Sequence, residues 1–253
     1  MKKNVVNDLV YFDKLKIVQN KDYFNFSLES ILLPNFVEIT PNTKKIIDFC
    51  TGNVPIPLVL STRTNSEIYA VEIQKEIYEL AKETIEINKL ENKIKLLNLD
   101  VKEIYNIFET DTFDLITCNP PYFKKEENSL VNENMIKSIA RHEILIELED
   151  VIKISKKLLK NGGSLSIVHR TDRLIEIIEL MKKYNIEPKR LQFIYPKHNK
   201  KSNLIMIDGR KNGNTGLTVL NPLFVHKEDG SYTEEVLKMF GKWFYDTKKL
   251  WRK

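Results

Sequence analysis

The sequence predicts an α/β protein built on one wound, mostly parallel β-sheet. Short apolar segments alternate with amphipathic helical segments along the 253 residues, which is the pattern of successive βαβ units. One apolar segment, 46–49, runs into a turn of small residues, and Glu72 follows Gly52 by twenty positions. This is the spacing of a nucleotide-binding βαβ unit. The hydrophobic content of 42% suits one large core, so the length fits one domain better than two.

The first half of the chain contains three predicted strands and one clear helix. The strands are 46–49, 68–71 and 93–99, each rich in β-branched and other apolar residues. Between the second and third, the spacing of apolar residues predicts a helix over 75–88. Its buried face consists of Ile77, Leu80, Ala81, Thr84 and Ile85.

The second half repeats the alternation. A strand is predicted at 113–118 and a helix at 147–160, whose inner face carries Leu148, Val151, Ile152, Ser155, Leu158 and Leu159. Gly162 and Gly163 are predicted to end that helix and to start a strand at 164–169. Asp172 is predicted to cap a helix that runs to about Tyr184. Two further strands, 191–195 and 203–207, flank a basic loop.

Acidic residues follow three of these strands. Asp48, Glu72 and Asp100 stand at the ends of the first three, where open α/β sheets bind their ligands. Cys50, Gly52 and Asn53 form the turn after Asp48. In a nucleotide site, the turn brings backbone close to the ligand, Glu72 accepts hydrogen bonds from ribose hydroxyls, and Asp100 receives the exocyclic amine of an adenine. Each acid alone could instead be a surface residue or a helix cap.

The most informative motif is Asn119-Pro120-Pro121-Tyr122-Phe123, at the end of the strand 113–118. The prolines hold the carbonyls of Asn119 and Pro120 outward in a stiff turn. An amine on an aromatic ring could donate to the Asn119 side-chain oxygen and to the Pro120 carbonyl, while Tyr122 stacks on the ring. The same residues could also form an ordinary turn.

At this point the chain resembles a known family, the class I S-adenosylmethionine (SAM) dependent methyltransferases, and more closely the bacterial tRNA1(Val) adenine-37 N6-methyltransferases. Further matching segments are 25–33, 60–64, 70–74, 139–143, 158–163, 168–170 and 221–223. The Asn119-Pro120-Pro121-Tyr122 motif is shared with DNA adenine, rRNA guanine and protein glutamine methyltransferases. The flanking segments favour the tRNA family.

The resemblance implies a Rossmann-like, seven-stranded, mostly parallel sheet whose last two strands form an antiparallel edge pair. It implies a single domain, 1–253, with an amino-terminal lid at 1–42, a core at 43–210 and a carboxy-terminal extension at 211–253. It implies SAM as the cofactor, with Asn119, Pro120, Pro121 and Tyr122 as catalytic residues. The cofactor-binding residues are then Asp48, Cys50, Gly52, Asn53, Glu72, Ile73, Asp100 and Asn119.

The chain departs from the family in the cofactor turn. Val54 and Pro55 stand where a final glycine and its neighbour are usual. A β-branched residue disfavours positive φ and adds bulk near the cofactor. Two outcomes follow from this departure: a rearranged turn, or weaker cofactor binding. In the extreme case, the chain is an RNA-binding protein with a degraded SAM site.

Several residues are predicted to contact the substrate. The polar segment 124–134 is expected to order over a target nucleotide, with Phe123, Arg141 and His142 around it. Lys197, Lys200 and Lys201 form a basic cluster suited to phosphates. The tail 242–253 interleaves cations with aromatics, and it is expected more readily to be an amphipathic closing helix with its aromatics packed inward than a contact for RNA. The formal net charge of +5 permits nucleic-acid binding without requiring it.

The expected reaction is methyl transfer from SAM to the N6 amine of a tRNA adenine, at position 37 of the anticodon loop. Methylation of rRNA guanine N2 or of a protein glutamine is the alternative. We expect a cytoplasmic protein without membrane segments, because the apolar runs are strand-sized and no signal-peptide core follows Met1. The sequence leaves the oligomeric state open, with a monomer favoured. The two cysteines, Cys50 and Cys118, have no metal-type spacing, so neither a disulfide nor a metal site is expected.

Overall fold

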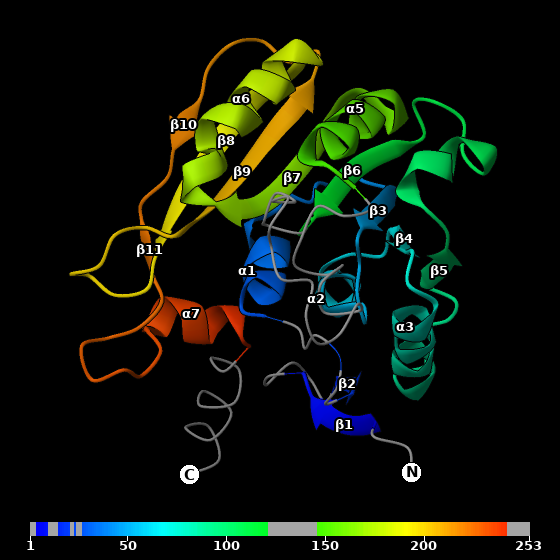
Figure 1. Cartoon of the computed structure of the whole chain (residues 1–253), viewed down its shortest axis with the longest axis horizontal. Helices are drawn as coiled ribbons and strands as arrows, with labels where there is room; N and C mark the ends of the chain where they lie inside the picture. The colour runs from blue at the N-terminus through cyan, green and yellow to red at the C-terminus, as the bar shows by residue number, and fades with distance from the viewer. Residues whose placement is uncertain (1–3, 10–14, 21–22, 24–26, 121–145, 242–253) are drawn as a thin grey trace, which may run out of the picture.

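The computed structural model describes residues 4–9, 15–20, 23, 27–120 and 146–241 (Figure 1). Among them, no helix combines the length and apolarity needed to cross a bilayer. The main element is a nine-stranded sheet. Its strands are β3 (Lys45–Phe49), β4 (Glu67–Glu72), β5 (Ile94–Asn98), β6 (Phe113–Cys118), β7 (Leu159–Arg170), β8 (Ile186–Tyr195), β9 (Leu204–Lys211), β10 (Thr218–Val219) and β11 (Leu223–Phe224).

The order of the strands has a switch point between β3 and β6. The sheet runs β10-β8-β9-β7-β6-β3-β4-β5, with β11 also paired to β8. From β3 the chain winds outward through β4 and β5, and from β6 it winds the other way through β7. The strand order therefore reverses between β3 and β6, and open α/β sheets bind ligands at the carboxyl ends of strands at such a point. The turn after β3 and the motif after β6 both lie there.

The predicted sheet is confirmed. Its seven predicted strands are β3 to β9, and among the described strands of this sheet only β9 runs antiparallel to its neighbours. The predicted antiparallel pair is β8 and β9. The short strands β10 and β11 add to β8 in parallel, so β8 is not fully exposed as an edge. Two residues carry too little apolar pattern for such strands to be predicted.

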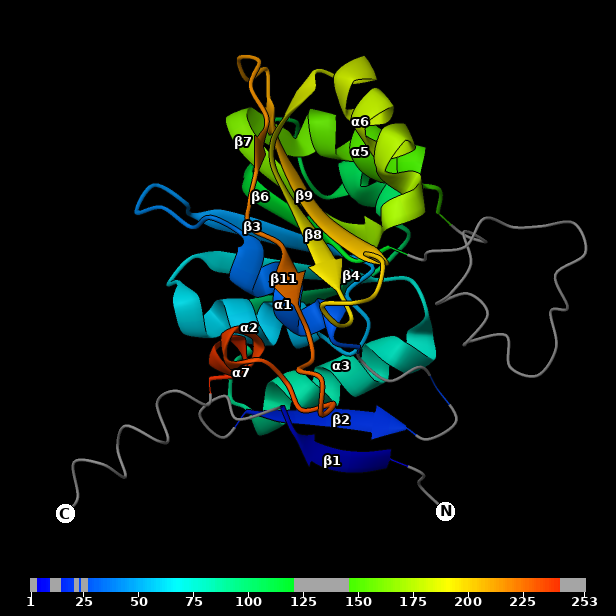
Figure 2. The same ribbon diagram turned by 90° about the vertical axis from the view of Figure 1, so that its left-hand side faces the viewer.

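Helices cover both faces of the sheet (Figure 2). On one face lie α1, α2 and α3, and on the other lie α5 and α6. Neighbouring residues of β3 serve opposite faces: Ile46 packs in the core under α1 and α2, and Ile47 packs in the core under α5 and α6, as the alternation of a strand requires. The helices are α1 (Glu29–Phe36), α2 (Pro55–Arg63), α3 (Lys75–Ile87), α5 (Leu148–Leu158), α6 (Leu174–Lys183) and α7 (Glu234–Met239), with 3₁₀ turns η1 (Val101–Asn106) and η2 (Thr171–Arg173).

The predicted inner face of α3 agrees with the structure, because its buried residues are the five predicted from spacing. Two other predictions were wrong in detail. The helix predicted to reach residue 160 ends at Leu158, because Leu159 already pairs with Phe113 as the start of β7. The predicted cap Asp172 lies inside η2 and forms an ion pair with Arg170 at 2.7 Å, while α6 begins at Leu174.

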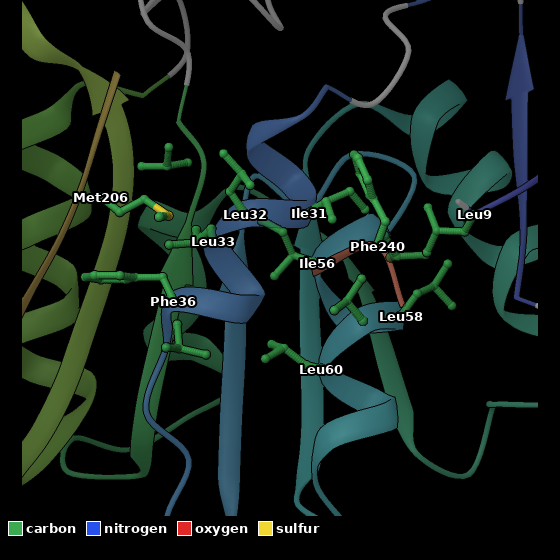
Figure 3. Close-up of a cluster of buried hydrophobic side chains, with 14 of the residues drawn as sticks. Leu9, Ile31, Leu32, Leu33, Phe36, Ile56, Leu58, Leu60, Met206 and Phe240 are labelled. Atoms are coloured by element: carbon green, nitrogen blue, oxygen red, sulfur yellow. The ribbon is translucent and has the colours of Figure 1, made fainter. Parts of the chain in front are cut away.

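The amino-terminal segment has two separate parts. A hairpin of β1 (Asn4–Asp8) and β2 (Lys16–Asn20) lies against α3, where the Val18 N–H donates to the Thr84 hydroxyl at 3.0 Å. Helix α1 is instead part of the core, and Figure 3 shows its apolar side chains among those of α2. The lid function of residues 1–42 and the division into three segments stay predictions.

The carboxy-terminal part returns to the same face. Helix α7 lies next to α1, and the Asn35 side chain donates to the Met239 carbonyl at 3.2 Å. Phe240, which follows α7, is buried in the core shared with α1 and α2 (Figure 3).

Candidate active site

The turn after β3 has an unusual backbone. Cys50, Gly52 and Val54 all have positive φ, at 53°, 60° and 65°. The Thr51 N–H donates to the Val71 carbonyl at 3.0 Å, which holds the turn against β4. A Cβ atom added to Gly52 would meet no atom of the described residues within 4 Å. The described part of the chain therefore leaves room for a ligand that approaches the Gly52 backbone closely.

Val54 adopts the left-handed conformation that glycine would have in its place. Its φ of 65° and ψ of 33° put it at the amino-terminal cap of α2, and its side chain is fully buried in the core under α1 and α2. Pro55 then takes the first position of the helix, where its missing N–H is no disadvantage. The bulk of the valine thus points into the protein.

Glu72, at the end of β4, is joined to this turn. One carboxylate oxygen accepts the Gly52 N–H at 2.9 Å, and the other accepts the Gln74 N–H at 2.9 Å. Burial raises the pKa of Glu72, and these backbone hydrogen bonds oppose the rise. A carboxylate has about four acceptor positions, and the backbone groups of Gln74, Gly52 and Ile73 hydrogen-bond to this one, so Glu72 keeps some acceptor capacity. Its role as a ribose ligand stays a prediction. Ile73, next to it, is among the exposed hydrophobic residues.

Asp48 connects the turn to the strand that carries the motif. It is fully buried, and its two oxygens accept hydrogen bonds from the hydroxyls of Thr51 and Thr117, each at 2.6 Å. Burial raises its pKa to about 7, the two hydroxyls lower it, and the charge of Glu72 raises it. Asp48 thus holds the cofactor turn and β6 in register. Its role as a direct cofactor ligand stays a prediction.

The other predicted residues of the turn are also placed. The Asn53 side-chain amide donates to the Val18 carbonyl at 2.9 Å, so it fastens β2 to the turn. Cys50 and Cys118 are free thiols. Burial and the neighbouring Cys50 raise the pKa of Cys118 well above its ordinary value.

Asp100 acts in the structure as a helix cap. One of its oxygens accepts the Lys102 N–H at 2.9 Å, and the other lies 3.6 Å from the Lys102 ammonium. A contact with adenine stays a prediction. Sequence reasoning missed Asn98, at the end of β5, whose side chain donates to the carbonyls of Glu72 and Ile73 at 2.8 and 3.2 Å. An amide at a strand end was its only signal.

Asn119 and Pro120 follow β6, on the side of the sheet where the carboxyl ends of β3 and β4 also lie. Pro120 is buried and Asn119 is half-buried. The Asn119 side-chain nitrogen donates to the Ser30 hydroxyl, 3.4 Å away, at the start of α1. Sequence reasoning missed this contact. Pro121, Tyr122, Phe123, Arg141 and His142 lie outside the described residues, as does the segment 124–134.

The basic loop between β8 and β9 lies at the same sheet edge, because Leu204 pairs with Arg170 at the end of β7. Lys200 and Lys201 are exposed. Lys197 donates to the Glu228 carbonyl at 3.0 Å, and the ring of His198 stacks on Phe224 with centroids 4.7 Å apart. The loop therefore presents cations beside a half-buried aromatic surface.

Comparison with known proteins adds to this geometry. The sequence model of the methyltransferase small domain matches residues 29–187. Two similar proteins are the tRNA1(Val) (adenine(37)-N6)-methyltransferases of Cytophaga hutchinsonii and Flavobacterium psychrophilum. The first is 24% identical over 77% of this chain and 80% of its own length. The second is 25% identical over 92% of this chain and 97% of its own length.

Solved structures show the same fold. A predicted O-methyltransferase from Agrobacterium tumefaciens has a TM-score of 0.67 at 21% identity, over 84% of this chain and 95% of that one. The TYW2 protein of P. horikoshii, solved with MeSAdo, has a TM-score of 0.59 at 11% identity, over 84% of this chain and 73% of that one. Identities this low establish likeness of fold only.

Proposed function

Because the chain belongs to the methyltransferase small domain family, we propose that it methylates the exocyclic N6 amine of an adenine in tRNA, at position 37 of the anticodon loop. SAM is the methyl donor. The observation that carries the proposal is the placement of Asn119 and Pro120 beside the Gly52 turn, at the point where the strand order reverses. The names of the similar proteins from Cytophaga and Flavobacterium support the tRNA adenine.

The residues of the turn fit the cofactor. No atom of the described residues blocks a ligand that lies against the Gly52 backbone, and Glu72 retains acceptor capacity for a hydroxyl beyond its backbone hydrogen bonds. When bound, SAM supplies a methyl group activated by its positive sulfur. Asp48, fixed by Thr51 and Thr117, holds the turn at a set distance from Asn119.

The motif residues orient the amine. The Asn119 side-chain oxygen accepts one amine hydrogen and the Pro120 carbonyl accepts the other, which leaves the nitrogen lone pair directed at the donor site. Positioning of this kind accounts for much of the rate of a group transfer. The amine loses a proton easily once it is methylated, so the proposal needs no strong base. Extrusion of an adenine from a loop also costs little free energy, because few base pairs must break.

The alternative, an RNA-binding protein with a degraded SAM site, is less well supported. It rested on Val54 and Pro55, and Val54 keeps the left-handed backbone with its side chain turned into the core. No contact of the described residues favours guanine N2 or a glutamine side chain over an adenine.

Two measurements test the proposal. Purified protein with SAM and tRNA transcripts is expected to produce N6-methyladenosine by nucleoside mass spectrometry, and a transcript with guanine at position 37 is expected to remain unmethylated. Cellular tRNA from a strain without the gene is expected to lack the modification. Methylation of the guanine-37 transcript at the same level would remove the assigned position, and unchanged cellular N6-methyladenosine would remove the tRNA adenine.

A further inference from the structure

The contact between α1 and the motif has a chemical consequence for Asn119. Ser30 is buried, at 5% exposure, and lies in the first turn of α1. Its hydroxyl oxygen accepts from the Asn119 side-chain nitrogen at 3.4 Å. An amide side chain offers a donor end and an acceptor end. When the donor end is directed at Ser30, the acceptor end is directed away from α1.

Helix α1 is fixed firmly enough to act as a support. Pro34 lies inside it and has no N–H for the Ser30 carbonyl, so bonds from outside hold the helix. The Arg63 guanidinium donates to the carbonyls of Pro34 and Val37. The Arg190 guanidinium donates to the Phe36 carbonyl at 3.1 Å and lies 4.6 Å from the centre of the Phe36 ring.

The apolar side of α1 completes this anchoring. Ile31, Leu32 and Leu33 are fully buried in the core with the side chains of α2 (Figure 3). Close-packed cores resist displacement of their side chains. The position of Ser30 relative to β6 is therefore set by the core and by two arginines, and does not depend on the ligand.

We propose that Ser30 is a positioning residue for methyl transfer: its hydroxyl holds the Asn119 amide in the orientation that presents the side-chain oxygen to the target amine. This rests on the proposed function. Without Ser30, the amide loses this contact, and the opposite orientation would place its NH₂ end against the amine, where two donors face each other. Held by Ser30, the acceptor needs no reorientation during the reaction, which is the condition for effective stabilisation by a preorganised dipole.

The test compares two serines that differ in what they contact. Ser30→Ala is expected to lower kcat about 3- to 10-fold, the range for loss of one neutral hydrogen bond, with unchanged affinity for SAM and little change in the KM for tRNA. The matched control is Ser61→Ala on the neighbouring α2, which removes a buried hydroxyl that donates to the Leu58 carbonyl at 2.7 Å. The control is expected to keep the parental kcat.

A double variant separates positioning from general structure. In an Asn119→Ala background, Ser30→Ala is expected to have no further effect on kcat, because Ser30 acts through the amide. In the ligand-free protein, the side-chain amide NMR signals of Asn119 are expected to move in Ser30→Ala and to stay in Ser61→Ala. Melting temperatures show whether each variant folds. If Ser30→Ala does not fold, the NMR comparison uses Ser30→Cys in its place.

Three results would overturn the inference: parental kcat in folded Ser30→Ala, effects of Ser30→Ala and Asn119→Ala that multiply, or unmoved Asn119 signals. These are distinguishable from failure of the proposed function. A parent protein that binds SAM and methylates no tRNA removes the proposed function and this inference with it. If the parent is active and the Ser30→Ala variant has the parental kcat, this inference alone is removed.

Discussion

The backbone N–H of Gly52 donates a 2.9 Å hydrogen bond to the Glu72 carboxylate, so the turn after β3 is fastened to the acid at the end of β4. The acid that the sequence predicts as a ribose ligand is thus also a support for the turn that approaches the cofactor. Replacement of Glu72 removes both contributions together.

Glu72→Ala is expected to weaken SAM binding by about 1.5–3 kcal/mol, the range for hydrogen bonds to a charged group. Glu72→Gln retains one acceptor for the Gly52 N–H and is expected to lose less. Titration calorimetry measures both. If all three proteins bind SAM equally, Glu72 is not a cofactor ligand.

Asn119→Ala is expected to reduce kcat by roughly 10²-fold or more, as for loss of one preorganised polar partner. Affinity for SAM and melting temperature are expected to change little, because Asn119 is half-buried at the end of a strand. Single-turnover methylation of tRNA gives the rate directly. A variant that methylates at the parental rate would reduce the motif to a turn.

The buried carboxyl of Asp48 makes stability depend on pH. Its pKa rises from 3.8 to about 7 on folding, chiefly through burial. Between these values the folded protein holds a proton that the unfolded chain releases, so the free energy of unfolding falls as the pH rises through this window and levels off above it. The raised pKa of Glu72 acts in the same direction.

Asp48→Asn is expected to remove the Asp48 part of this dependence. Urea unfolding of parent and variant, at about pH 5 and about pH 8, isolates the contribution of one carboxyl as the difference between the two proteins. The parent is expected to lose stability relative to the variant at the higher pH. A difference that stays constant with pH would mean that Asp48 titrates normally.

Two opposing effects meet at Val54: burial of its side chain stabilises the fold, and its positive φ destabilises it. Val54→Gly relieves about 1–2 kcal/mol of strain at positive φ and loses about 1.5–3 kcal/mol of buried side chain. A modest fall in melting temperature is therefore expected, with unchanged or tighter SAM binding. Val54→Ala keeps the strain and loses most of the burial, so it is expected to be less stable than Val54→Gly. The reverse order, or loss of SAM binding in Val54→Gly, would contradict this description of the turn.

Exchange of Lys200 and Lys201 for glutamine is expected to weaken tRNA binding at low salt. The slope of log affinity against log salt concentration is expected to fall by roughly 1.5–2 in magnitude, about one phosphate contact for each lysine. The control exchanges Lys82 of α3 and Lys95 of β5, which are also exposed and lie at the other end of the sheet. Equal slopes for the two double variants would exclude a specific contact by the loop.

The sequence predicts the elements of this fold better than it predicts the contacts of the site. Helix α3 and the strands β3 to β6 follow from apolar spacing, because burial of one face imposes a period on the chain. The helix end at Leu158 was missed because the pairing of Leu159 with Phe113 is a contact between distant residues. Gly162 and Gly163, from which the helix end was predicted, carry no information about that pairing.

The same reason explains what was missed in the site. Asp48, Glu72 and Asn119 could be singled out, because polar residues at the carboxyl ends of buried parallel strands share the side of the sheet where such proteins bind ligands. The partners Thr117, Asn98 and Ser30 could not. Each makes a hydrogen bond whose other end lies 26 to 89 positions away, and a serine in an apolar helix carries no local pattern that points to a distant amide.

The short strands β10 and β11 affect how copies of this protein meet. A bare outer strand offers a row of backbone groups that a second chain can extend into a continuous sheet. Here the Leu220 N–H donates to the Leu191 carbonyl, and the Val225 N–H donates to the Tyr195 carbonyl, each at 2.8 Å, so groups near the middle and at the end of β8 are already occupied. A chain shortened to end at Lys211 would expose them. It would be prone to aggregation through this edge while every residue of the candidate site was still present.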